Sequence, residues 1–131
     1  MSGNVITNPD SDVHITQDNQ KKINTFAVRN GWMEELELEL KAKENDLKNL
    51  EDAEQEVVLM TDPIPILVGD SFVHFEPDAA GEELNKRIQL TKESIKKLNV
   101  DIASVKSEMN KLKADLYERF GDNINLENEE A

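Results

Sequence analysis

Apart from its acidic residues, this 131-residue sequence has few of the side chains that most often perform catalysis or bind metals. Cysteine is absent, which excludes disulfides, thiolate metal sites and cysteine nucleophiles. The two histidines are His14 and His74, and only His14 has acidic neighbours, in the segment Asp10–His14. Without a further soft ligand nearby, a solvated segment is favoured over a metal site there, and His74 fits an alternate position of a strand. We therefore expect no metal ligands.

Acidic side chains are numerous, but they occupy the heptad positions that a solvated coiled-coil surface requires. No pocket is expected that would shift their pKa values toward general acid–base catalysis. The five glycines are scattered, and none begins a phosphate-binding loop or a dinucleotide fingerprint. We expect no catalytic residues, no cofactor and no enzymatic activity.

The overall charge narrows the possible partners further. Acidic residues outnumber basic ones by 28 to 15, giving a net charge of −13, which repels phosphate backbones and anionic membrane surfaces. The N-terminal sequence has neither a basic region nor an apolar one, so neither export nor a membrane span is expected. The sequence predicts a cytoplasmic protein that binds neither nucleic acid nor membranes.

Two long stretches carry the apolar spacing of a coiled coil. In the first stretch, residues 17–59, seven of the ten a and d positions from 26 to 57 are apolar, with Arg29, Lys43 and Glu54 as the exceptions. The pair Asn30-Gly31 would ordinarily favour a turn, but the apolar phase continues beyond it, which favours an unbroken helix. In the second stretch, residues 78–120, nine of the eleven seam positions from 84 to 119 are apolar, and Gly121 follows as a stop signal.

The segment between these helices has a different composition. Residues 64–75 are rich in β-branched and aromatic residues, lie between prolines and contain Gly69-Asp70 at their centre. This pattern predicts a β-hairpin. Folding the chain at the hairpin gives an antiparallel coiled coil, in which Phe26 opposes Leu112 and Met33 opposes Val105. The fold class expected is mainly α: one domain over residues 1–131, with a flexible segment 1–16 and an acidic tail 121–131.

Charge supports pairing between the two helices. Residues 34–56 carry ten acids and three lysines, whereas residues 82–120 carry seven acids and nine bases. The first helix therefore attracts the second and repels its own copy, although each exposed ion pair contributes at most about 1 kcal/mol. Charge thus selects the partner, and the apolar seam supplies stability.

An isolated two-stranded hairpin has two open edges and is marginally stable in water. It either folds back to cap its own coiled coil or joins hairpins of other chains in an inter-subunit β-barrel. Two helices cannot cover both faces of a ribbon beyond their ends, which favours assembly. The residues expected at this subunit interface are apolar: Ile66, Val68, Phe72, Val73 and Phe75.

Four blocks of sequence, in order across nearly the whole chain, resemble the beta class of the prefoldin family. They are residues 18–27 (DNQKKINTFA), 49–53 (NLEDA), 68–72 (VGDSF) and 116–127 (LYERFGDNINLE), the last being the most specific. The resemblance implies a heterohexamer of two alpha-class and four beta-class subunits whose hairpins form the barrel. It also implies an ATP-independent chaperone (holdase) that binds unfolded actin and tubulin and delivers them to the cytosolic chaperonin.

Binding of an unfolded client requires apolar surface that the subunit leaves incompletely buried. Four residues at the expected end of the coiled coil remote from the hairpin are candidates, and we call them the tip residues: Ile23, Phe26, Leu116 and Phe120. The alternative is that these side chains simply close the end of the coiled coil. An alternative function for the whole chain is that of a coiled-coil adaptor or scaffold subunit in another hetero-oligomer.

Overall fold

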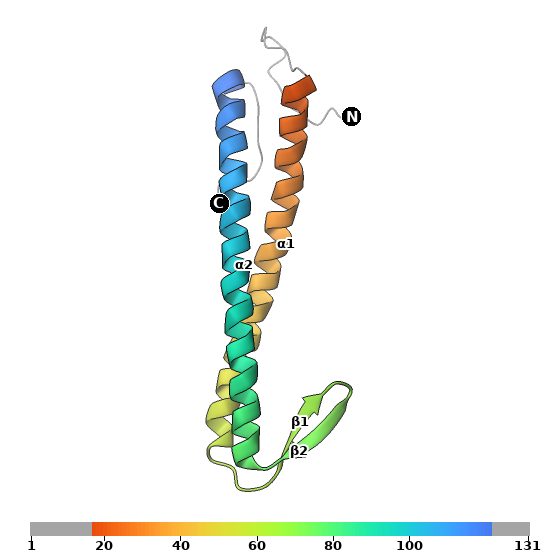
Figure 1. The fold of residues 1–131 in the computed structure, drawn as a ribbon, viewed down its shortest axis with the longest axis vertical. Helices are drawn as coiled ribbons and strands as arrows, with labels where there is room; N and C mark the ends of the chain where they lie inside the picture. Colours follow the sequence, from red (N-terminus) through yellow and green to blue (C-terminus); the bar gives the residue numbers. More distant parts are fainter. Residues whose placement is uncertain (1–16, 122–131) are drawn as a thin grey trace. The chain divides into compact units, whose positions relative to one another are not determined.

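A computed structural model describes residues 17–121, apart from the side chain of Phe120. Helix α1 (Gln17–Val57) is followed by strands β1 (Ile64–Val68) and β2 (Ser71–Phe75) and by helix α2 (Pro77–Phe120) (Figure 1). This is the mainly helical fold expected, with two long helices and one antiparallel hairpin between them. The flexible segment expected over residues 1–16 and the tail beyond Gly121 lie outside the described residues.

Helix α1 is unbroken through Asn30-Gly31, because the apolar phase on both sides holds the backbone in one helix. It ends at Val57, two residues earlier than the sequence predicted. The amide of Leu59 donates to the Glu56 carbonyl at 3.1 Å and that of Met60 to the Val57 carbonyl at 3.0 Å. These bonds span three residues instead of four, so the chain leaves the helix in a tight turn.

Helix α2 begins at Pro77, one residue before the predicted start. The amide of Ala80 donates to the carbonyl of Glu76 at 2.8 Å, which makes Glu76 the capping residue and Pro77 the first residue of the helix. Proline is favoured there because its missing N–H would have no partner within the helix.

The chain divides into two compact units, one formed by residues 1–37 and 100–131 and the other by residues 38–99. In the first unit, the facing stretches of α1 and α2 share one apolar cluster. Its buried members are Ile23, Phe26, Met33, Val105, Met109 and Leu116. Lys22 lies 3.7 Å from Asp115, and Arg29 lies 3.1 Å from Glu108. Both pairs lie within one residue of the register in which Phe26 opposes Leu112 and Met33 opposes Val105. The two helices are therefore not shifted by a heptad from the expected register in this unit.

The charge count favours acids on the first helix and bases on the second, and these two ion pairs have the reverse arrangement. Both bases lie on α1 and both acids on α2. The count covered residues 34–56, whereas Lys22 and Arg29 precede that acidic stretch. These two pairs therefore join local charges that the count over residues 34–56 did not include.

In the second unit, the end of α1, the start of α2 and the hairpin form a second cluster. Its buried members are Val57, Ile66, Ala80 and Leu84, and Leu50, Ala53, Ile64 and Phe75 pack against them. The hairpin turns in two residues between the paired Val68 and Ser71, and Gly69 has a φ of 64°. Such a positive φ is required at the first central position of both turn types that favour two-residue hairpins, I′ and II′, and glycine adopts it without strain.

Candidate functional site

Part of one face of the hairpin packs against its own subunit, and the rest of that face and the whole of the other face are exposed. In the register Ile64↔Phe75, Ile66↔Val73 and Val68↔Ser71, the side chains of these pairs share one face. Ile66, Ile64 and Phe75 use this face to pack against the cluster of the second unit, and Ile66 is only 8% exposed. The proposed interface residues Ile66 and Phe75 thus have intramolecular partners.

The other proposed interface residues are exposed. Val73, the cross-strand partner of Ile66, and Val68, nearer the turn, lie on the same face as Ile66, and each remains substantially exposed. On the opposite face, Phe72 is 67% exposed and pairs with the exposed Leu67. The structure therefore divides the five predicted residues into an inner pair, which covers the helices, and an outer group that has no cover in the described chain.

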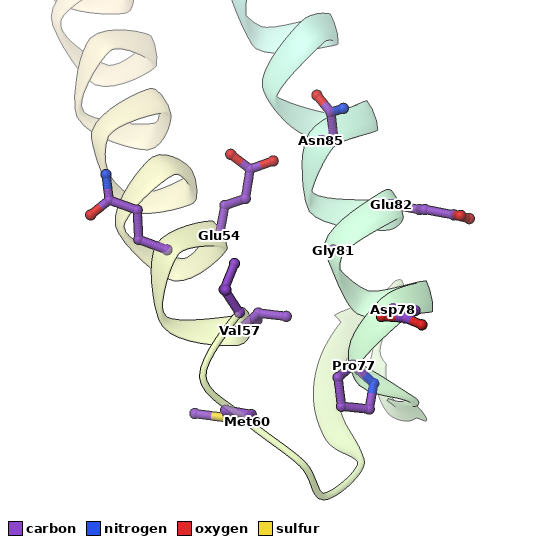
Figure 2. A pocket seen from close by; sticks show the side chains of 10 residues that line it. Glu54, Val57, Met60, Pro77, Asp78, Gly81, Glu82 and Asn85 are labelled. Carbon is purple, nitrogen blue, oxygen red and sulfur yellow. The ribbon is translucent and has the colours of Figure 1, made fainter.

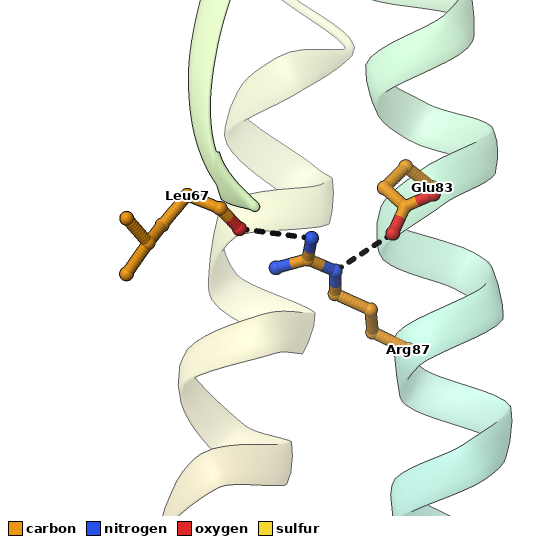
Figure 3. Close-up of polar contacts among 3 residues, drawn as sticks. All are labelled: Leu67, Glu83 and Arg87. Carbon is orange, nitrogen blue, oxygen red and sulfur yellow. Dashed lines mark hydrogen bonds and ion pairs between the residues drawn. The ribbon is translucent and has the colours of Figure 1, made fainter. Parts of the chain in front are cut away.

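Arg87 fixes the hairpin against helix α2. Its Nη2 donates to the carbonyl oxygen of Leu67 at 3.0 Å, and its Nε donates to Oε2 of Glu83 at 2.8 Å (Figure 3). Glu83 lies one helical turn before Arg87, so it holds the guanidinium in place while the guanidinium holds strand β1. Sequence reasoning missed this role because a single arginine on a charged helix face gives no signal of a backbone acceptor twenty residues away.

A second missed feature follows the end of α1. Val58 and Leu59 are 78% and 84% exposed, and the neighbouring Met60 is about half exposed. The sequence could have indicated this feature, because these three consecutive apolar residues lie outside the heptad positions. Apolar residues that do not belong to the seam indicate exposed apolar surface.

An open hollow of about 580 Å³ adjoins this run in the second unit. Glu54 and Val57 from α1, Met60 from the loop, and Pro77, Asp78, Glu82 and Asn85 of α2 line it (Figure 2). It brings carboxylates beside apolar side chains but contains no nucleophile or histidine. Among residues 17–121, no group of three or more acidic or histidine side chains is placed to hold a metal ion.

The tip residues are buried where the structure describes them. Leu116 is fully buried, and Ile23 and Phe26 belong to the same cluster of the first unit. The side chain of Phe120 lies outside the described part. In this conformation the three described tip residues close the pairing of the two helices. The apolar side chains that do face solvent in this unit include Val28 and Trp32 on α1, and the guanidinium of Arg29 lies 4.4 Å from the Trp32 ring centroid.

Comparison with known proteins decides the family. Residues 20–123 match the family described as "Prefoldin subunit". The chain belongs to the prefoldin subunit family. A probable prefoldin subunit 4 of Drosophila melanogaster is 38% identical over 121 residues, covering 91% of this chain and 88% of that protein. The human prefoldin subunit 4 is 36% identical over 123 residues, covering 92% of each.

A solved structure supports the fold independently. The prefoldin beta subunit from Thermococcus strain KS-1 superimposes with a TM-score of 0.72, covering 82% of this chain and 96% of that one, at 15% sequence identity. The two chains therefore share the arrangement of two long helices and a hairpin. Prefoldin membership implies a chaperone subunit that assembles with other prefoldin subunits, and prefoldin is a chaperone family, not a known class of enzyme. Neither described helix has an apolar stretch sufficient to cross a membrane.

Proposed function

We propose that this chain is a beta-class subunit of a cytoplasmic prefoldin heterohexamer, built from two alpha-class and four beta-class chains, that holds unfolded proteins without ATP. Its clients are of the actin and tubulin type, and it delivers them to the cytosolic chaperonin. This proposal rests on the hairpin, whose residues Phe72, Val73 and Val68 are exposed, in a chain that belongs to the prefoldin family.

Assembly through the hairpin follows from what the subunit itself leaves uncovered. The inner pair already contacts α1 and α2, whereas Phe72, Val73 and Val68 remain substantially exposed within the described chain. Burying apolar area stabilises a complex by about 25 cal/mol per Å². Hairpins that join edge to edge in an inter-subunit β-barrel gain this energy and satisfy their unpaired backbone groups.

Client capture requires apolar surface that is available only part of the time. Ile23, Phe26 and Leu116 are buried between the helices of the first unit, so a client reaches them when the helix ends separate. Helix termini open at lower free energy than helix centres because they have neighbours on one side only. Each such contact is small and reversible, and several subunits together hold one client.

The function is tested by light scattering of a chemically unfolded protein, such as actin, that is diluted into buffer. The complex reconstituted from all its subunits should suppress the scattering without ATP. A coiled-coil adaptor or scaffold would assemble but leave the scattering unchanged, and that result would reject the holdase.

The assembly site is tested by changing Phe72 and Val73 to aspartate. Both side chains are exposed in the isolated chain, so its helical circular dichroism should be retained. The double variant should fail to enter the complex on size exclusion, because two charges cannot be buried in an apolar interface without partners. Normal incorporation of the double variant into the complex would rule out Phe72 and Val73 as interface residues.

A further inference from the structure

Asn30-Gly31 is the one place in the sequence where an asparagine precedes a glycine. Such a pair is the usual site of spontaneous deamidation, because glycine has no side chain to hinder attack by its own backbone nitrogen on the asparagine amide. Both residues lie inside helix α1. The reactive groups are therefore adjacent in the chain, and the helix decides whether they react.

The reaction needs only water and proceeds through a cyclic imide. The nitrogen of Gly31 gives up its proton to the solvent, forms a bond to Cγ of Asn30 and expels the side-chain nitrogen as ammonia. Water then opens the ring at either carbonyl carbon. Opening at Cγ leaves aspartate, whereas opening at the main-chain carbonyl leaves isoaspartate, in which the backbone runs through the former side chain. Either product carries a carboxylate in place of a neutral amide.

The intact helix blocks ring closure. In an α-helix the amide of Gly31 donates to the carbonyl of Ala27, four residues earlier, so the nitrogen is not free to lose its proton. A helical ψ of about −42° at Asn30 also keeps Cγ turned away from the Gly31 nitrogen. Deamidation therefore requires the helix to open at this point.

The surroundings of the pair add no second protection. Gly31 is exposed and Asn30 is only partly buried, and a Cβ added at Gly31 would meet no atom within 4 Å. Among residues 17–121, no hydrogen bond holds the side-chain amide of Asn30. Once the backbone bond between Gly31 and Ala27 breaks, the side-chain amide and water both have access to the reacting atoms.

The position of the pair determines what the product does to the structure. Phe26 and Met33, one helical turn to either side, are buried in the apolar cluster of the first unit. Arg29, the preceding residue, lies 3.1 Å from Glu108 on α2. Isoaspartate inserts an additional carbon atom into the backbone between these contacts. The stretches before and after it then cannot both keep the helical phase that places their apolar side chains in the cluster.

We propose that Asn30-Gly31 is a deamidation site that helix α1 keeps closed and that reacts only when the first unit opens locally. Isoaspartate formed there then leaves that unit loosened. The chemistry needs only the opening of α1, so it is independent of the proposed holdase function. It is also independent of assembly through the hairpin, which belongs to the second unit.

Hydrogen exchange and deamidation of the full-length wild-type chain test the gate, because both need the same Gly31 N–H to leave the Ala27 carbonyl. Deamidation at position 30 is followed by mass spectrometry in mildly alkaline buffer, and again in guanidinium chloride, where the helix is absent. The ratio of these two rates should match the exchange protection of the Gly31 amide to within about threefold. Faster deamidation would show that the closed helix does not protect the pair. Slower deamidation would show that this opening does not permit ring closure, and either result overturns the proposal.

Met33→Ala and Leu38→Ala are matched variants, since each removes a large apolar side chain from α1. Met33 is buried in the first unit, whereas Leu38 is 70% exposed and belongs to the second. In native buffer Met33→Ala should deamidate at least about tenfold faster than wild type, and Leu38→Ala within about twofold of it. In guanidinium chloride all three chains should react equally. Equal rates in native buffer would overturn the proposal, and the wild-type comparison decides it alone if Met33→Ala does not fold.

The effect of the product is measured on wild-type chain that is deamidated in guanidinium chloride, refolded and separated to give its isoaspartate form. The control is Asn30→Asp, which carries the same charge on a normal backbone. The amide of Met33 should exchange at least about tenfold faster in the isoaspartate form than in the control. Equal exchange in the two chains would show that the inserted carbon does not loosen the first unit, and this part of the proposal would fall.

Discussion

Arg29 occupies a position of the heptad seam where an apolar residue is expected, and its contacts account for the exception. The guanidinium is shared between two neighbours. Its Nε donates to Glu108 on α2 at 3.1 Å, and its carbon centre lies 4.4 Å from the ring of Trp32 on α1. The aliphatic stem therefore stays at the seam while the charge is satisfied at its border. Trp32 is about half exposed, and its exposed ring carries the stacked Arg29 guanidinium.

A double-mutant cycle on Arg29→Ala and Glu108→Ala measures this interhelix pair. Both side chains are partly exposed, so the coupling free energy should be below about 1 kcal/mol and should shrink as salt is added. Urea unfolding of the two single variants and the double variant gives the coupling. A salt-independent coupling of several kcal/mol would show that the pair is shielded from water in a way that the structure does not show.

Gly31 lies inside the unbroken helix α1, and a Cβ added there would have no atom within 4 Å. Gly31→Ala should therefore raise the free energy of unfolding by about 0.5–1 kcal/mol, the difference in helix propensity between glycine and alanine. Chemical denaturation measures the change. Gly69→Ala is the matched control and should destabilise, because a φ of 64° is strained for alanine. Destabilisation by Gly31→Ala would indicate that α1 needs the freedom of glycine at this position.

In the hairpin, the buried side chains contribute to the stability of the isolated chain, and the exposed side chains are the ones proposed for assembly. Its alternation, turn and prolines predicted both strands, and the structure confirms an antiparallel hairpin at that place. Which apolar side chains would face the subunit's own helices could not be predicted. Periodicity assigns residues to two faces but does not say which face the helices cover, and Ile66 and Val73 lie on the same one. The Arg87 contact was unpredictable because its acceptor is a backbone carbonyl, which has no sequence signature.

Ile66 and Val73 are cross-strand partners that differ in burial, so they form a matched pair for the isolated chain. Ile66→Ala should lower the free energy of unfolding by about 2 kcal/mol or more, because it leaves a cavity between α1, α2 and β1. Val73→Ala should cost less than about 1 kcal/mol, since much of that side chain is already in solvent. Thermal and urea unfolding report both values. Equal effects would mean that the two side chains are equally covered.

At the scale of the whole molecule, holding a client and assembling with other subunits use different residues. The assembly residues proposed here belong to the hairpin, whereas the tip residues belong to the cluster of the first unit. Seam spacing correctly predicted that Ile23, Phe26 and Leu116 would be brought together. It could not show how often they separate, since that depends on the free energy of opening and not on the pattern.

Changing Ile23 and Phe120 to serine tests the client site in the assembled complex. The hexamer should still form, because the hairpin is untouched, and suppression of actin aggregation should weaken. The same changes are made in the other subunits, since several weak contacts share one client. Trp32→Ser is the control for general loss of apolar surface, because Trp32 is exposed without belonging to the buried cluster. Unchanged suppression by the tip variants, or a larger loss in the control, would move the client site away from the tip residues.

The apolar run that follows α1 has a consequence for the colloidal behaviour of the chain in isolation. Val58 and Leu59 are mostly exposed to solvent, and Phe72 adds further exposed apolar area. What keeps separate copies apart is the net charge of −13, and this repulsion vanishes near the isoelectric point of about 4.5. Static light scattering of the purified chain should therefore give a positive second virial coefficient at neutral pH and low salt. The coefficient should turn negative as salt is added or as pH approaches 4.5, and Leu59→Ser should delay that change.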